Sequence, residues 1–160
     1  SLTVANTRRN LPEALSPQIK STNFLNNILA KRESIAAGTF DSLFLNWKDE
    51  LTECTVSNLF FISGKTLHTP ALDCGILDGI TRTIVMTLAQ EEGVPVREGH
   101  YHLADLQRAE ECFLTNTSME IMPVNRVDSF AIGDGRPGSL TRRLQTRFAD
   151  SRTRFLEPTS

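Results

Sequence analysis

One stretch of the sequence has the make-up of an anion-binding turn, and it reads Gly75-Ile76-Leu77-Asp78-Gly79-Ile80-Thr81-Arg82. An apolar, helix-like run follows directly, so the stretch is expected to lead into a helix. The first amides of a helix have no partner within the helix, and the helix dipole favours an anion beside them. Ile80 and Thr81 would offer such amides, and Thr81 adds a hydroxyl group. On this motif alone, a helix start that binds nothing is the commoner explanation.

Two ionisable side chains stand where they could take part in a reaction. Lys20 follows Ile19 and precedes an expected helix start. An apolar surrounding there would lower the pKa of the amine and make it a nucleophile. Glu53 stands at the end of a short apolar strand, where a carboxylate could keep a proton on a ligand nitrogen. Both residues could instead be ordinary solvent-exposed charges, as most Lys and Glu residues are.

Small polar residues lie near these candidates in two places. Thr55, Ser57 and Asn58 follow Glu53, and a second polar run spans residues 115–118. The hydroxyl groups of the second run could bind a phosphate. A polar turn between two strands explains the same residues equally well.

Histidines and cysteines offer possible metal ligands. His100 and His102 would share one face of a strand, and His68 lies earlier in the chain. No acidic or cysteine residue stands at a ligand spacing near them, so we expect no metal site. The cysteines are widely spaced and odd in number, which predicts core or pocket residues and no disulfide framework: Cys54, Cys74 and Cys112.

Length and composition limit the class of protein. A chain of 160 residues with 39% hydrophobic residues can form one domain with a real core. The net charge of −2 gives no reason to expect nucleic acid or an anionic membrane as partner. No apolar run is long enough to cross a bilayer, and no signal peptide is evident. With unpaired cysteines, these features favour the cytoplasm.

The first half of the chain is expected to alternate strands with a helix. A strand within residues 1–9 precedes a segment that Pro12 and Pro17 keep irregular. Ser21 would cap a helix that ends at Gly38, and strands are expected at 40–45, 59–62 and 66–69, the last two joined by a hairpin turn at 63–65. The apolar face of the helix would be Phe24, Leu25, Ile28, Leu29 and Ile35.

The second half continues this alternation, which is typical of an α/β domain. Helices are expected from Ile80 to Gly93, over 103–109 and over 140–155, with strands at 94–97, 112–115 and 121–124 and a loop at 133–138. The last helix would expose a solvated row of arginines: Arg142, Arg143, Arg147, Arg152 and Arg154.

Several motifs recur in the same order and spacing in one family of enzymes. They are Ser16-Pro17-Gln18-Ile19-Lys20-Ser21-Thr22-Asn23-Phe24-Leu25, Thr52-Glu53 with Ser57-Asn58-Leu59-Phe60, the stretch 75–82, and Phe113-Leu114-Thr115-Asn116-Thr117 with Pro123-Val124 and the closing Gly133-Asp134-Gly135-Arg136-Pro137-Gly138. The chain resembles the class IV, or fold type IV, pyridoxal phosphate enzymes. That family includes branched-chain and D-amino acid aminotransferases and aminodeoxychorismate lyase.

The resemblance implies a cofactor, pyridoxal 5′-phosphate, and a role for each candidate residue. Lys20 would form the internal aldimine with the cofactor and carry the proton between the substrate Cα and the cofactor C4′. Glu53 would keep the pyridine nitrogen protonated, so that the ring can accept electrons. Leu77 would pack against the ring. The phosphate would be held by Ile80, Thr81 and Thr117, and Ser57 and Asn58 would complete the cofactor site.

The sequence departs from the family pattern at particular positions. Asp49 and Cys54 stand where the family usually has glycine. The sequence resembles the lyase members at Cys54, Asn116 and the run 122–124. At Glu120-Ile121 it resembles the aminotransferases. The motifs therefore indicate the cofactor better than the substrate.

Family members also carry a smaller N-terminal domain that completes the substrate pocket. The resemblance implies that residues 1–160 are the large, cofactor-binding domain alone, an α/β domain with a mixed, barrel-like sheet packed with helices. The isolated chain could then be inactive.

The resemblance implies transamination between an amino acid and a 2-oxo acid, of the branched-chain or D-amino acid aminotransferase type. The first alternative is 4-amino-4-deoxychorismate lyase, which makes 4-aminobenzoate and pyruvate. The second is an inactive fragment or remnant that serves as a binding module. The expected partners are the small-molecule substrates and, by resemblance, a second copy of the chain in a homodimer.

Overall fold

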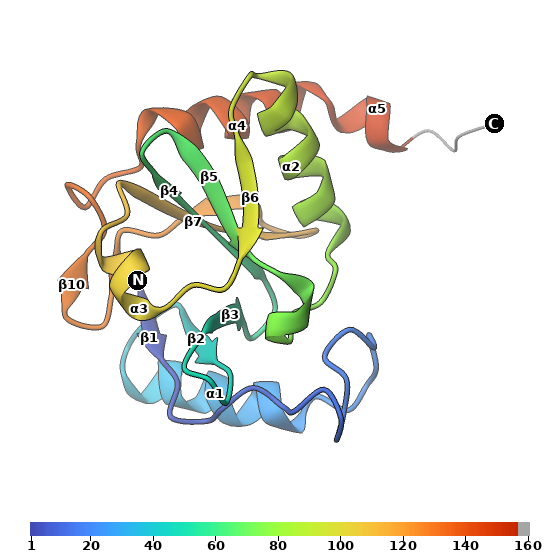
Figure 1. Cartoon of the computed structure of the whole chain (residues 1–160), viewed down its shortest axis with the longest axis vertical. Helices are drawn as coiled ribbons and strands as arrows, with labels where there is room; N and C mark the ends of the chain where they lie inside the picture. Colours follow the sequence, from blue (N-terminus) through green and yellow to red (C-terminus); the bar gives the residue numbers. More distant parts are fainter. Residues whose placement is uncertain (157–160) are drawn as a thin grey trace.

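The computed structural model describes residues 1–156, and in this range ten strands form one mixed sheet (Figure 1). The main path runs β10-β9-β1-β2-β3-β4-β5-β6, while β7 pairs with the other edge of β4 and β8 pairs with β7. Contacts β1–β2, β1–β9 and β5–β6 are parallel, and the rest are antiparallel. The strands are β1 Leu2–Val4, β2 Asp41–Leu45, β3 Leu51–Cys54, β4 Asn58–Ser63, β5 Thr66–Pro70, β6 Val96–Gly99, β7 Glu111–Asn116, β8 Glu120–Pro123, β9 Arg126–Val127 and β10 Phe130–Ala131.

Strand β4 is the centre of the sheet, because its side chains enter two separate cores. Successive residues of a strand point to opposite faces. Phe60 and Ile62 pack in one apolar cluster, whereas Leu59 and Phe61 pack in the other. A strand buried on both faces reads as a continuous apolar run, as β4 does.

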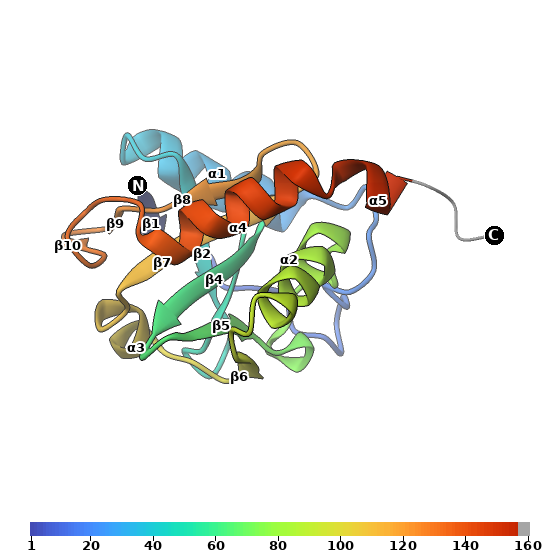
Figure 2. The same cartoon turned by 90° about the horizontal axis from the view of Figure 1, so that it is seen from above.

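Five helices and one short 3-10 helix pack around this sheet within the described residues. They are α1 Leu25–Ala36, the 3-10 helix Leu72–Cys74, α2 Ile80–Glu91, α3 Leu103–Gln107, α4 Ser139–Asp150 and α5 Arg152–Leu156. Helices α2 and α4 lie side by side and close the cluster that contains Phe60 (Figure 2). Helix α1 lies at the opposite end of the molecule and packs on β2 (Figure 1). The longest helices of the described residues are α1, α2 and α4, with 12 residues each. This length is too short to cross a bilayer, so the described chain has no membrane-spanning helix.

Two predictions for α1 were wrong. The helix begins after Phe24, and neither Ser21 nor any other described side chain caps it. The side that packs on the sheet consists of small residues, Ala30 and Ser34, which let the helix approach β2 closely; Ser42 of β2 donates a hydrogen bond to the Ala30 carbonyl. The large apolar side chains therefore remain on the solvent side: Phe24, Leu25, Ile28, Leu29 and Ile35.

Most other predicted elements are confirmed with shifted ends. The hairpin turn at 63–65 is confirmed, with Gly64 and Lys65 at φ values of 57° and 66°. The short strands β9 and β10 were not predicted, because two-residue strands leave no periodic pattern. The predicted helix 140–155 is interrupted at Ser151. Its arginines are partly exposed as expected, and several pair with Glu91, the last residue of α2, or with Glu92, which follows it.

Candidate active site

A cleft of about 900 Å³ lies where the irregular N-terminal segment, the β3–β4 turn and the start of α2 meet. The turn between β7 and β8 completes its lining. All the residues that the resemblance assigned to the cofactor line this cleft, although they come from distant parts of the chain: Lys20, Glu53, Ser57, Asn58, Leu77, Ile80, Thr81 and Thr117.

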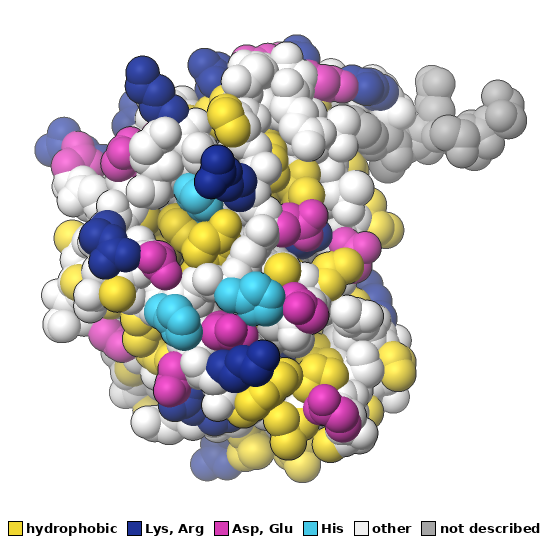
Figure 3. All heavy atoms as spheres, viewed as in Figure 1, with side chains coloured by type: hydrophobic (Ala, Val, Ile, Leu, Met, Phe, Trp, Pro, Cys, Tyr) yellow, Lys and Arg dark blue, Asp and Glu magenta, His cyan; other side chains and the backbone are white. Residues whose placement is uncertain are grey.

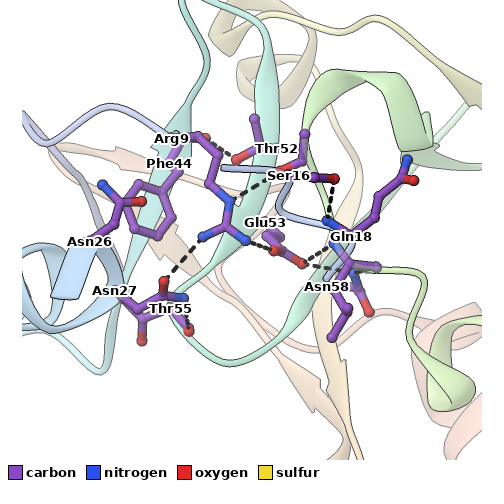
Figure 4. Close-up of polar contacts among 12 residues, drawn as sticks. Arg9, Ser16, Gln18, Asn26, Asn27, Phe44, Thr52, Glu53, Thr55 and Asn58 are labelled. Carbon is purple, nitrogen blue, oxygen red and sulfur yellow. Dashed lines mark hydrogen bonds and ion pairs between the residues drawn. The ribbon is translucent and has the colours of Figure 1, made fainter. Parts of the chain in front are cut away.

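Glu53 is a buried carboxylate with three hydrogen-bond donors (Figure 4). Oε1 accepts a bond from Arg9 at 2.5 Å, and Oε2 accepts bonds from Asn58 Nδ2 at 3.0 Å and from the Leu77 amide at 3.1 Å. Burial raises the pKa of Glu53 to about 7, although the Arg9 charge and the Leu77 amide act in the opposite direction. With only 5% of its surface exposed, Glu53 is not the solvated strand-end carboxylate of the alternative interpretation.

Arg9 is the residue of this site that sequence reasoning missed. Its guanidinium is buried over the Phe44 ring, donates from Nε to the Gly75 carbonyl at 3.1 Å and from Nη1 to Asn27 at 3.2 Å, and pairs with Glu53 (Figure 4). Burial lowers the pKa of Arg9, and Glu53 opposes this shift. In the sequence, Arg8 and Arg9 look like two surface charges after a strand, so no local signal marked Arg9 for burial.

Gly79 is required by the close approach of Asn58. Its φ of −75° suits any residue, but a Cβ atom at this position would lie 2.2 Å from Asn58 Oδ1. The Asn58 amide group bridges Glu53 and the Leu77 carbonyl, with the second bond at 2.8 Å. The glycine therefore lets the carboxylate network and the start of α2 share one wall of the cleft.

Donors for an anion collect in the same cleft. No side chain of the described residues caps α2, so the amides of Ile80 and Thr81 remain available. Ser57 Oγ and Thr115 Oγ1 are buried without a hydrogen-bond partner among residues 1–156. Thr81 is buried as well, whereas Thr117 is exposed on the β7–β8 turn.

Lys20 reaches this cleft, but its surroundings differ from the prediction. The sequence predicted an apolar, desolvated amine, whereas Lys20 is exposed and its neighbour Ile19 is 63% exposed. The segment between Pro12 and Pro17 forms turns rather than regular structure, which leaves this stretch on the surface. Leu77, on the other side of Glu53, is half-buried.

The sequence pattern of the amino-transferase class IV family matches residues 1–127. The chain belongs to this family. Its relatives include a putative branched-chain-amino-acid aminotransferase of Methanocaldococcus jannaschii, 40% identical over 92% of this chain and 51% of the relative. D-alanine aminotransferase of Listeria monocytogenes is 38% identical over 85% of this chain and 47% of the relative. Aminodeoxychorismate lyase of Bacillus subtilis is 37% identical over 89% of this chain and 48% of the relative.

Solved structures confirm the fold of this class IV chain. The branched-chain amino acid aminotransferase of Escherichia coli superposes with a TM-score of 0.91 at 32% identity, over 94% of this chain and 50% of the other. A second branched-chain amino acid aminotransferase, solved with pyridoxamine 5′-phosphate, gives a TM-score of 0.90 at 29% identity over the same shares. The chain thus spans about half the length of the relatives it matches.

The family depends on pyridoxal phosphate, and the cleft fits this cofactor. The partnerless hydroxyls of Ser57 and Thr115 and the uncapped start of α2 are donors of the kind that a phosphate accepts. The Glu53 carboxylate is the kind of group that holds a proton on a ring nitrogen.

Proposed function

We propose that this chain is the cofactor-binding large domain of an enzyme that transfers an amino group between an amino acid and a 2-oxo acid. One observation carries the proposal: a buried, triply hydrogen-bonded carboxylate lines the same cleft as an uncapped helix start and partnerless hydroxyls. Relatives named as branched-chain and D-alanine aminotransferases support the choice of reaction.

When bound, pyridoxal phosphate supplies a protonated pyridine ring that withdraws electrons from the substrate Cα. In our proposal Glu53 holds that ring proton, and Arg9, Asn58 and the Leu77 amide fix the orientation of the Glu53 carboxylate. The Arg9 charge also favours the ionised form of Glu53. Arg9 is thus a positioning residue.

The remaining residues bind and exchange protons. The amides of Ile80 and Thr81, with hydroxyls of Thr81, Ser57 and Thr117, would hold the phosphate. The exposed Lys20 amine would reach the cofactor from the cleft mouth and move the proton at the substrate Cα. Leu77 would cover the ring and exclude water.

The lyase reaction is the second candidate. Cys54 follows Glu53, as in lyase members of the family, and lines the cleft. A relative of 37% identity is an aminodeoxychorismate lyase. Both reactions need the same cofactor residues, so substrate contacts decide between them.

We further propose that the functional unit is a cytoplasmic homodimer. The large apolar side chains on the solvent side of α1 support an interface, because a contiguous exposed apolar surface is typical of one. The three cysteines are free, which agrees with a reducing compartment.

One series of spectra separates the three candidates. The chain is mixed with pyridoxal phosphate, and its visible absorption is followed after addition of a branched-chain amino acid or D-alanine. We expect the absorption of the bound cofactor to fall and to return when a 2-oxo acid is added. Pyruvate release from aminodeoxychorismate without this exchange would establish the lyase instead. The chain spans about half the length of its relatives, so the decisive sample also contains the domain that the resemblance places before it. A cofactor bound to that protein that responds to none of these substrates would contradict both enzyme functions and favour a binding module.

A further inference from the structure

Three different metal-binding side chains meet outside the cleft, on the face that carries β6 and α3. Figure 3 shows histidine and acidic side chains gathered on this face. Glu50 precedes β3, Cys74 ends the 3-10 helix and His100 follows β6. One ligand atom from each lies within 4.8 Å of the other two. The sequence spacing showed no such partner for His100; the sheet pairing brings them together.

The prediction that His100 and His102 share one face of a strand was wrong. Both residues follow the end of β6, and His102 lies directly before α3. His102 Nδ1 donates a bond to the Asp49 carbonyl at 3.0 Å, so its ring is engaged with the backbone and stands apart from the three clustered side chains.

The separations suit a tetrahedral centre. His100 Nδ1 lies 3.1 Å from Glu50 Oε1 and 3.5 Å from Cys74 Sγ. Bonds of about 2.0 Å to N or O and about 2.3 Å to S place the ligand atoms of tetrahedral zinc roughly 3.3 to 3.6 Å apart. Small side-chain shifts would therefore suffice to admit the ion.

Neighbouring groups already orient two of these ligands. His100 Nδ1 donates to Glu50 Oε1 in this structure, so an ion would take the place of that proton. Asp73 Oδ2 lies 3.3 Å from His100 Nε2 and can accept a bond from a proton on Nε2, which favours that tautomer once the ion occupies Nδ1. Asn46 donates to Glu50 Oε2 at 2.7 Å, so Oε1 is the oxygen left toward His100. A carboxylate behind a ligating histidine is a common feature of zinc sites.

We propose that Glu50, Cys74 and His100 bind a divalent cation of the zinc type, with Asp73 orienting His100 and water as the fourth ligand. The mixture of thiolate, imidazole and carboxylate suits Zn²⁺ better than Mg²⁺ or Ca²⁺, which prefer oxygen alone. On binding, a sulfur–metal bond forms and the Cys74 proton passes to solvent. The charges of thiolate and carboxylate balance the ion.

Such an ion would link the start of β3, the turn before Leu77 and the end of β6. The Cys74 carbonyl accepts a bond from Asn46, and the next carbonyl, of Gly75, accepts one from Arg9. The ion would thus hold in place the turn that forms one wall of the cleft, from the side away from the cofactor site. Binding to the folded state alone stabilises that state by mass action.

The test titrates Co²⁺ and Zn²⁺ into the chelator-treated chain. We expect one ion per chain, cobalt absorption bands of thiolate coordination, release of a proton and a higher midpoint of thermal unfolding. His100→Gln and Cys74→Ser should each weaken binding at least tenfold, and Asp73→Asn about tenfold, as outer-shell changes do. His102→Gln is the matched control and should bind as the parent does.

His100 is exposed, so His100→Gln should leave the fold intact. Circular dichroism checks that Cys74→Ser is folded. Equal affinity of parent, His100→Gln and Cys74→Ser would overturn the proposal. So would cobalt spectra without thiolate coordination, or an unchanged unfolding midpoint at saturating Zn²⁺.

Discussion

At the scale of single residues, the site depends on a charge pair that two distant segments build. Arg9 and Glu53 are both nearly buried, so each would be costly to bury without the other. The motif around Glu53 predicted its place in the cleft, but Arg9 could not be predicted. Its burial results from Asn27, Gly75 and Phe44, which approach it only in the folded chain.

Glu53 should also make stability depend on pH. Burial raises its pKa in the folded chain to about 7 from an ordinary value of 4.5, so between these values the folded state keeps a proton that the unfolded chain loses. The stabilisation is complete below pH 4.5 and is lost as the pH rises to about 7. Relative to Glu53→Gln, the parent's free energy of unfolding should fall by up to about 1.4 kcal/mol per pH unit in this window.

Denaturant titrations of the cofactor-free parent and Glu53→Gln chains across this pH range measure the difference. The variant also leaves Arg9 unpaired, but this adds a constant offset and no slope. If the free energies of unfolding of the two chains change in parallel with pH, the pKa of Glu53 in the folded chain is ordinary.

Asp49 shows how local geometry explains a departure from the family pattern. Its φ is 60°, a left-handed conformation in which glycine is strained least and Asp is better tolerated than most residues. The resemblance implies glycine at this position in other members, and glycine meets the same backbone requirement. The sequence difference could be noticed from the motif, but its cause needed the backbone angles.

At the scale of elements, the start of α2 is the part whose geometry the sequence predicted best. The glycine turn, the helix beginning at Ile80 and its closure before Gly93 all agree with the structure. Helix α1 was predicted in place but with the wrong buried side. Amphipathic patterns mark which residues are apolar, and they do not say whether the sheet or another surface will cover them.

Removing the Thr81 hydroxyl should weaken cofactor binding. A hydrogen bond to a charged group contributes about 1.5 to 3 kcal/mol, so Thr81→Val should raise the dissociation constant of pyridoxal phosphate roughly tenfold or more. Thr87→Val is the matched control, because its hydroxyl bonds only the Thr83 carbonyl of the same helix. Equilibrium dialysis gives both constants. An equal dissociation constant for Thr81→Val and the parent would show that the phosphate does not bind at Thr81.

At the scale of the whole molecule, the fold and family followed from motifs spread over the chain, and the relatives confirm both. The resemblance implied a homodimer but no interface, because the exposed apolar surface is evident only once the sheet has buried the other side of α1. The chain spans about half the length of its relatives, so its assembly must be measured on the chain itself.

We expect the apolar side of α1 to hold two copies of the chain together. Ile28→Lys puts a charge in the middle of that surface, where burying an isoleucine contributes about 1.5 to 3 kcal/mol, and should weaken dimerisation roughly tenfold or more. Leu11→Lys changes an exposed leucine outside the helix and serves as control. Sedimentation equilibrium measures the dimer constant. A parent chain that is monomeric, or a dimer that Ile28→Lys leaves intact, would refute this interface.

The central claim is that the cleft holds pyridoxal phosphate against Lys20. The direct measurement is borohydride reduction of the chain with one equivalent of cofactor, followed by peptide mapping of the labelled lysine. The chain contains three other lysines, Lys31, Lys48 and Lys65, and none of them lines the cleft. We expect the label on Lys20 and its loss in Lys20→Arg, whereas Glu53→Gln keeps the shape and hydrogen-bonding capacity of the side chain and should leave the labelling nearly intact. A label on Lys31, Lys48 or Lys65, or equal labelling of all four, would contradict the account.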